Sequence, residues 1–318
     1  MDVISFDGLL KKSIPPVEYL VGDIIPKSSL IYLYGPSGTF KTSFLLYTVI
    51  NGSMGKDVFD YKVEKPFKTL WIDEENREVG MKHKLNKLIN GMKVDLSGNY
   101  FMICNEINIL NKEHINEIEK IIKERDIDLL VIDSLTKVFP GRQRDEDETK
   151  FIFTRLNPLM VKYGVSIVVI AHSRKLGKDQ IHRTLEDLSG SKELGAQSDG
   201  ALLMYKYETN GYRLQQTKNR HAEETEPINF EVNSDDDSIE IRYLGLASDN
   251  IEAHNSSTKA SHYILGFMKP GKEYTFAEIQ EECNKVRIMR TSAYEGLKKL
   301  VKDNRVDKPR RDCYLLPN

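Results

Sequence analysis

One short segment carries the residue types that bind a chain of phosphates. Residues 35–42 read GPSGTFKT, which fits G-x-x-x-x-G-K-[ST] except that Phe40 stands where the second glycine is usual. In such loops backbone N–H groups and a helix N-terminus surround the phosphates, while the lysine contacts the β- and γ-phosphates and the hydroxyl ligates Mg²⁺. A chance glycine turn between a strand and a helix is the alternative. The predicted nucleotide-binding residues are Gly35, Pro36, Ser37, Gly38, Thr39, Phe40, Lys41, Thr42 and Ser43.

Two apolar runs further along the chain end in carboxylates. DLLVID ends at Asp133, where a side chain can hold the hydration shell of Mg²⁺, although many such residues only cap a helix. LWIDEEN ends in three acidic residues, one of which could orient or deprotonate an attacking water. The alternative for LWIDEEN is a solvated acidic turn. With the phosphate loop, these runs predict a metal site at Thr42 and Asp133 and a catalytic carboxylate beside it.

The elements that must position these residues alternate along the first two hundred positions. Continuous apolar strands separated by amphipathic helices predict an α/β fold with a mostly parallel sheet that helices cover on both faces. Ligands in such sheets bind at the carboxyl ends of the strands, where the motifs lie. We expect strands at 30–34, 68–73, 100–105, 128–133 and 165–171, and helices at 41–53, 78–93, 111–125 and 146–163.

The pattern changes after residue 200. GALLMY, YRLQQTK, INFEV and SIEIRY are short apolar runs between polar turns, which predicts an antiparallel extension of the same sheet. Residues 247–257 contain few large apolar side chains and are expected to be a linker. The predicted domains are therefore an ATPase-like body at 1–246 and a small second domain at 258–318.

Charge and cysteine usage narrow the class of protein. The net charge of −2 excludes a uniformly basic coat protein for nucleic acids, but thirteen Lys and Arg face eight Asp and Glu from Thr258 onward. The three cysteines lack the spacing of a metal site or a disulfide framework. No apolar run reaches the length of a membrane span, and the N-terminus lacks the order of a signal peptide. We expect a cytoplasmic protein with no membrane partner.

The order GPSGTFKT, LWIDEEN, LLVIDSL and IVVIAHSRK resembles the RecA-type P-loop ATPases. Across about residues 14–245 it is similar to the branch of RepA-like hexameric replicative helicases, relatives of DnaB and RadA. The resemblance implies ATP and Mg²⁺ as ligands, a homo-oligomer that is a hexameric ring, and catalytic roles for Lys41 and a glutamate. Aligning IDEEN by its last acidic residue selects Glu75, with Glu74 as the alternative.

The resemblance also assigns a sensor and a DNA-facing loop. His172 occupies the place of a polar residue that links the γ-phosphate to loops facing DNA, although a packed or capping histidine is the alternative. The loop that follows is rich in basic residues and glycine, and in RecA-type rings it lines the channel. A solvated loop is the alternative to DNA contact. Its candidate residues for DNA contact are Arg174, Lys175, Lys178 and Arg183.

A K-x-R pair follows a later predicted strand. In DnaB-like and RepA-like enzymes such a pair enters the site of the neighbouring subunit, and Lys218 and Arg220 match the spacing. A cation supplied in this way contributes roughly 10³–10⁵ in rate. A plain basic turn is the alternative. If the family role holds, each catalytic site needs two chains.

The C-terminal segment predicts a winged helix-turn-helix. Helices in KASHYILGFMK, TFAEIQEEC and MRTSAYEGLKKLVKDN precede a hairpin in RVDKPRRDCYLLP, with DKPRRD as the tip of the wing. Ten Lys and Arg against four Asp and Glu from Lys285 onward favour phosphate contacts, although winged helices also dock proteins. The candidate DNA-binding residues are Arg287, Arg290, Ser292, Lys298, Lys299, Arg310 and Arg311.

Three functional hypotheses follow. The first is a ring-shaped, ATP-hydrolysing helicase of a plasmid, virus or mobile element that binds single- and double-stranded DNA. The second is a DNA-bound ATPase that does not translocate and acts as a recombinase or a regulatory switch. The third is a winged-helix DNA-binding scaffold with an inactive nucleotide site, against which the retained motif residues argue.

Overall fold

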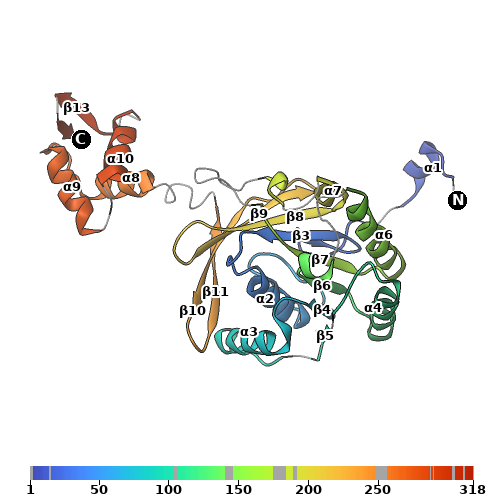
Figure 1. The fold of residues 1–318 in the computed structure, drawn as a ribbon. Coiled ribbons are helices and arrows are strands. Elements are labelled where there is room, and N and C mark those ends of the chain that lie inside the picture. Colours follow the sequence, from blue (N-terminus) through green and yellow to red (C-terminus); the bar gives the residue numbers. More distant parts are fainter. Residues whose placement is uncertain are drawn as a thin grey trace. The chain divides into compact units, whose positions relative to one another are not determined.

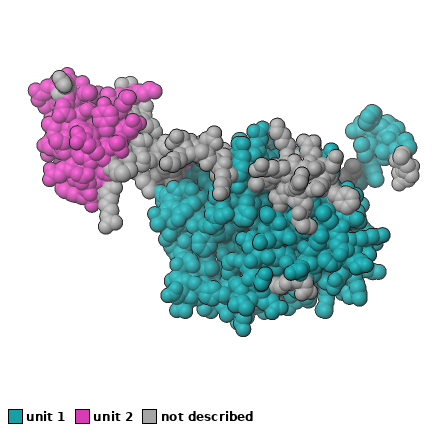
Figure 2. All heavy atoms as spheres, viewed as in Figure 1, with its two compact units in different colours: residues 1–244 teal, residues 245–318 magenta. Residues whose placement is uncertain are grey.

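The computed structural model of the chain divides into two compact units, Met1–Leu244 and Gly245–Asn318 (Figure 2). The residues that the structure describes are 3–13, 16–96, 98–103, 106–139, 146–174, 184–188, 192–247, 256–286, 288, 290–302, 305–310 and 312–317. No helix in these ranges combines the length and the apolar character that crossing a membrane requires.

A nine-stranded sheet forms the centre of the first unit (Figure 1). Six of its strands are parallel: β8, β3, β7, β6, β4 and β5 are neighbours in that order. In chain order the strands of the sheet are β3 (Leu30–Gly35), β4 (Thr69–Asp73), β5 (Tyr100–Ile103), β6 (Leu129–Asp133), β7 (Ser166–His172), β8 (Gly200–Lys206), β9 (Gly211–Asn219), β10 (Ile228–Ser234) and β11 (Ile239–Leu246). The prediction of a mostly parallel α/β sheet is confirmed.

Helices cover both faces of the parallel strands, as the continuous apolar runs require. On one face α2 (Lys41–Ser53) and α3 (Arg77–Met92) pack through residues such as Phe44 and Met81. On the other face lie α4 (Lys112–Arg125), α5 (Leu135–Val138) and α6 (Glu146–Tyr163). The sheet is therefore buried on both sides where β3, β6 and β7 run, and this explains why these strands lack polar alternation.

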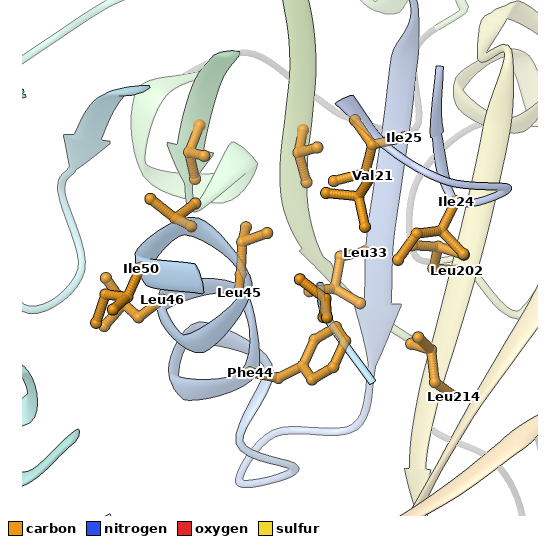
Figure 3. Close-up of a cluster of buried hydrophobic side chains, with 14 of the residues drawn as sticks. Val21, Ile24, Ile25, Leu33, Phe44, Leu45, Leu46, Ile50, Leu202 and Leu214 are labelled. Atoms are coloured by element: carbon orange, nitrogen blue, oxygen red, sulfur yellow. The ribbon is translucent and has the colours of Figure 1, made fainter. Parts of the chain in front are cut away.

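Large apolar side chains from distant segments meet above β3 (Figure 3). Phe44 and Leu45 of α2 lie over Leu33 of β3, and the short strands β1 (Tyr19–Val21) and β2 (Ile25–Pro26) close the cluster beside β3. Because α2 begins at the last residues of the phosphate loop, this packing fixes where the loop ends.

One expectation for the strands after residue 200 is wrong. β8 does not begin an antiparallel extension, since it lies parallel to β3 with Ile31 opposite Gly200. The chain passes from β7 through η1 (Leu185–Asp187) and α7 (Lys192–Gln197) before it enters β8 on the far side of β3. The antiparallel pairing starts one strand later, where β9 pairs with β8 and β10 with β9.

The second unit combines three helices with a small sheet. Its elements are α8 (Ser256–Phe267), β12 (Glu273–Tyr274), α9 (Phe276–Lys285), α10 (Arg290–Lys302), β13 (Asp307–Arg310) and β14 (Cys313–Leu315). The strand order is β12-β14-β13, and Ile264, Ile279 and Leu297 form part of the core. The predicted wing tip at 307–312 is therefore shorter than expected, because its first four residues belong to β13. A separate short helix, α1 (Phe6–Lys11), has no buried residue.

Candidate nucleotide site

The phosphate loop joins the carboxyl end of β3 to the first residue of α2. A Cβ at Gly35 would lie 2.0 Å from the carbonyl oxygen of Met204, so only glycine fits against β8 there. Nζ of Lys41 donates to the carbonyl oxygens of Gly35 and Pro36 at 3.0 and 2.8 Å, and only 6% of this residue is exposed. Burial lowers the pKa of Lys41 to about 8, because an ammonium group is poorly solvated there.

Phe40 keeps the backbone conformation for which glycine is usually chosen. Its φ of 59° and ψ of 23° are left-handed, which costs a residue with a Cβ about 1–2 kcal/mol. The ring packs edge to face against Tyr212 of β9, with 5.6 Å between centroids. Tyr212 in turn stacks on Phe230 of β10. The side chain therefore anchors the loop to the antiparallel strands and offsets part of the strain.

Two buried aspartates lie side by side at the ends of adjacent strands. Asp73 of β4 and Asp133 of β6 are in register, and both are fully buried. Oγ1 of Thr42 donates to Oδ2 of Asp133 at 2.9 Å, which brings the predicted metal-binding hydroxyl and carboxylate together. Burial raises the pKa of Asp133 to about 7, and the charges of Asp73 and Glu75 add to the rise against the Thr42 hydrogen bond.

The donor set at these strand ends fits a hard cation. Among the described residues, Oδ1 of Asp133 and Oδ2 of Asp73 are buried without a hydrogen-bond partner. Carboxylate and hydroxyl oxygens are the ligands that Mg²⁺ accepts, and it usually retains several waters. Asp133 and Thr42 would hold such an ion, and its charge would offset the cost of burying two carboxylates.

The two candidate glutamates point to different places. Glu75 is exposed and lines the same cavity as Lys41, whereas Oε1 of Glu74 accepts a hydrogen bond from the backbone of Ile107 at 2.9 Å. Burial raises the pKa of Glu74. The geometry therefore favours Glu75 as the carboxylate that faces a bound nucleotide.

A cavity of about 360 Å³ joins the loop to helix α3 and to the β10–β11 turn. Sequence reasoning missed the α3 residues His83, Lys84 and Lys87, all of which line it. It also missed Asn76, whose Nδ2 lies 3.2 Å from Oδ1 of Asp73 and 3.5 Å from Oδ2 of Asp133. The predicted helix at 78–93 contained the signal, because residues 84 and 87 share one face.

His172 lies where a γ-phosphate sensor would be placed. It ends β7 in register with Gly35, and its Nδ1 is 3.4 Å from Oγ of Ser37. The residue lines the cavity, and burial, followed by the charge of Lys41, lowers the pKa of His172. A neutral imidazole is therefore favoured beside the loop.

Lys218 and Arg220 lie at the opposite end of the sheet from the loop. Nζ of Lys218 donates to the carbonyl oxygens of Gly195 and Ala196, the last turn of α7, at 2.8 and 2.9 Å. Arg220 pairs with Asp199 at 3.1 Å, and Asp199 accepts from the backbone of Leu30, the first residue of β3. β3 separates this end from the phosphate loop by about 17 Å, so neither cation reaches the loop of its own chain.

The predicted DNA-binding residues are distributed unevenly. Arg174 is engaged within its own loop, since it pairs at 3.0 Å with the buried Asp187. Arg290 and Lys298 are exposed on α10, and Arg310 pairs with Glu273 at 2.7 Å. Outside the described residues lie Lys175, Lys178, Arg183, Arg287, Arg311 and the side chains of Ser292 and Lys299.

Comparison with known proteins identifies relatives of the first unit. The profile of the family described as AAA domain matches residues 2–178. The ATPase domain of a DnaB-like helicase superposes with a TM-score of 0.52 at 14% identity, over 67% of this chain and 85% of that one. A KaiC-like protein from the archaeon Pyrococcus horikoshii OT3 gives a TM-score of 0.48 at 17% identity, over 71% and 99%. No curated protein sequence matches significantly.

Proposed function

Because the chain belongs to the AAA domain family, we propose that it is an ATP-hydrolysing motor that acts on DNA as a ring of identical subunits. The expectation of a RecA-type P-loop ATPase fold is confirmed. Within that fold, the proposed activity is that of a RepA-like replicative helicase of a plasmid, virus or other mobile element. The hexameric ring and the DNA partner are parts of this proposal.

The arrangement around the cavity supports hydrolysis. A triphosphate on the loop would accept hydrogen bonds from backbone N–H groups and from Lys41, while Asp133 and Thr42 hold Mg²⁺, which neutralises phosphate charge when bound. Glu75 orients a water and receives its proton as the water oxygen bonds to the γ-phosphorus and the bond to ADP breaks. His172, hydrogen-bonded to Ser37, is placed to sense the γ-phosphate.

The observation that carries the ring is the position of Lys218 and Arg220. They lie at the amino end of the parallel strands, about 17 Å from their own phosphate loop, and half of the Arg220 side chain is exposed. A neighbouring chain that presents its carboxyl strand ends to this surface would receive both cations. Head-to-tail contacts of this kind close into a ring when the rotation allows it.

The second unit supplies a candidate DNA contact. Its element order and its β12-β14-β13 sheet support the proposal of a winged helix. On α10, Arg290, Tyr294 and Lys298 recur every four residues and are exposed, while Ala293 and Leu297 on the other side are buried. This solvent-facing row would follow a phosphate backbone, with α10 in the position of a recognition helix.

The proposal is tested by unwinding of a forked duplex with ATP and Mg²⁺, together with the native mass of the protein on single-stranded DNA. We expect a closed oligomer that displaces the strand, and no displacement by Lys41→Ala. DNA-stimulated hydrolysis without displacement would replace the motor by an ATPase that does not translocate. An oligomer without any turnover would refute both.

A further inference from the structure

Three lysines around the cavity are bonded to neutral oxygen atoms. Lys41 donates to loop carbonyls, Lys84 to the amide oxygen of Asn76, and Lys87 to the carbonyl of Asp235 at 2.6 Å. None of the three takes part in an ion pair found among the described residues. The cavity therefore holds positive charge that is not neutralised at contact distance, as a site for a polyanion requires.

Lys84 is the lysine on α3 that is connected to the metal-binding carboxylates. Asn76 accepts its ammonium at Oδ1 and turns Nδ2 toward Asp73 and Asp133. Asp133 accepts from Thr42, so a chain of three contacts links Lys84 to the end of the phosphate loop. A phosphate whose oxygens share the metal held there would lie next to this ammonium group.

Helix α3 is held firmly enough to position a catalytic group. Met81 and Leu88 are buried on its inner side. Near its C-terminal end a Cβ at Gly91 would lie 2.1 Å from the carbonyl oxygen of Ile239, so the helix backbone touches β11 directly. Asn90 also donates to the carbonyl of Asp237 at 3.0 Å. Packing against both the core and the β10–β11 turn fixes the side chains that face the cavity.

We propose that Lys84 is a second catalytic cation, supplied by the same chain, that contacts the γ-phosphoryl group of ATP during hydrolysis. This inference rests on the proposed ATPase activity. Lys84 transfers no proton: water supplies the nucleophile and its proton goes to Glu75, while the ammonium group stabilises negative charge on the transferred oxygens. Each site would then have Lys84 from its own chain and Arg220 from the neighbour.

The test compares the full-length chain with Lys84→Met, Lys84→Arg and Lys82→Met in steady-state hydrolysis. Lys82 is the matched control, because it lies on the same helix but is exposed and does not line the cavity. Removal of one preorganised donor to a transition state costs roughly 10²–10³ in kcat. We expect about a 10²-fold fall in kcat for Lys84→Met with little change in KM, partial recovery in Lys84→Arg, and no change in Lys82→Met.

A binding measurement separates catalysis from a structural role. In Lys84→Met the Kd of ADP should stay within about threefold of wild type, while the Kd of ADP with aluminium fluoride rises at least about tenfold, by the logic of transition-state binding. Equal weakening of both ligands, or a folded Lys84→Met with wild-type kcat, would overturn the assignment. A wild-type chain that binds ATP but never hydrolyses it would refute the proposed function, and this inference would fall with it.

Discussion

Replacing Asp133 with asparagine is expected to stabilise the nucleotide-free protein while it removes Mg²⁺-dependent turnover. Asp133 is fully buried, faces Asp73 across two strands, and has one oxygen without a hydrogen-bond partner among the described residues. Asparagine keeps an oxygen that can accept from Thr42 and carries no charge. The substitution therefore removes the cost of a buried carboxylate and leaves the shape of the site nearly unchanged.

The magnitude follows from the two pKa values of Asp133. The pKa is about 7 in the folded chain against 3.8 as the reference, so the folded state binds the proton more tightly and stability falls as pH rises between these values. The slope is about 1.4 kcal/mol per pH unit, which sums to at most about 4 kcal/mol above pH 7. Asp133→Asn should gain little near pH 4 and most near pH 8.

Urea unfolding without Mg²⁺ or nucleotide measures this difference. Trp71, the single tryptophan, lies on β4 two residues before Asp73, so its fluorescence reports on the first unit. Asp236→Asn is the matched control, because Asp236 is exposed and the substitution removes the same charge from the β10–β11 turn. A gain for Asp133→Asn that does not grow with pH, or a loss at pH 8, would refute the reasoning.

Three further predictions concern other parts of the chain. Arg220→Ala should lower turnover by roughly 10³-fold or more with the Kd of ATP within about threefold, measured by hydrolysis and nucleotide titration; a large binding loss would contradict the role in the neighbouring site. Phe40→Gly should preserve turnover but lower the unfolding free energy by roughly 1 kcal/mol, because relief of left-handed strain only partly offsets loss of the ring contact with Tyr212. Abolished turnover would instead give the ring a specific role. Arg290→Ala with Lys298→Ala should weaken duplex binding and reduce the salt slope by about 2, and an unchanged slope would place DNA elsewhere.

The sequence predicted the parallel strands and the loop well, because their information is local. A run such as residues 129–133 is apolar at every position before its aspartate, and only a strand buried on both faces requires that. Lys41, Thr42 and Asp133 could be found for the same reason, since each sits at a fixed place relative to a strand end.

What the sequence left undetermined depends on which strands are neighbours. Asp73 faces Asp133 only because β4 lies beside β6, and neither run contains that order. The same holds for β8, whose parallel place beside β3 depends on the passage through α7. Lys84 joins the site because α3 packs back over the carboxyl ends of the strands, so helical spacing alone could select its face and not its target.

The aromatic contact of Phe40 has a consequence beyond the nucleotide. Tyr212 and Phe230 continue from it to Phe59, and Phe59 stacks on Tyr243 with 5.0 Å between centroids. Tyr243 stands one residue before the end of the first unit. Five rings in sequence thus connect the turn that receives the phosphates with the point where the chain departs toward its second unit, and a residue tolerated in place of glycine is the first link of that connection.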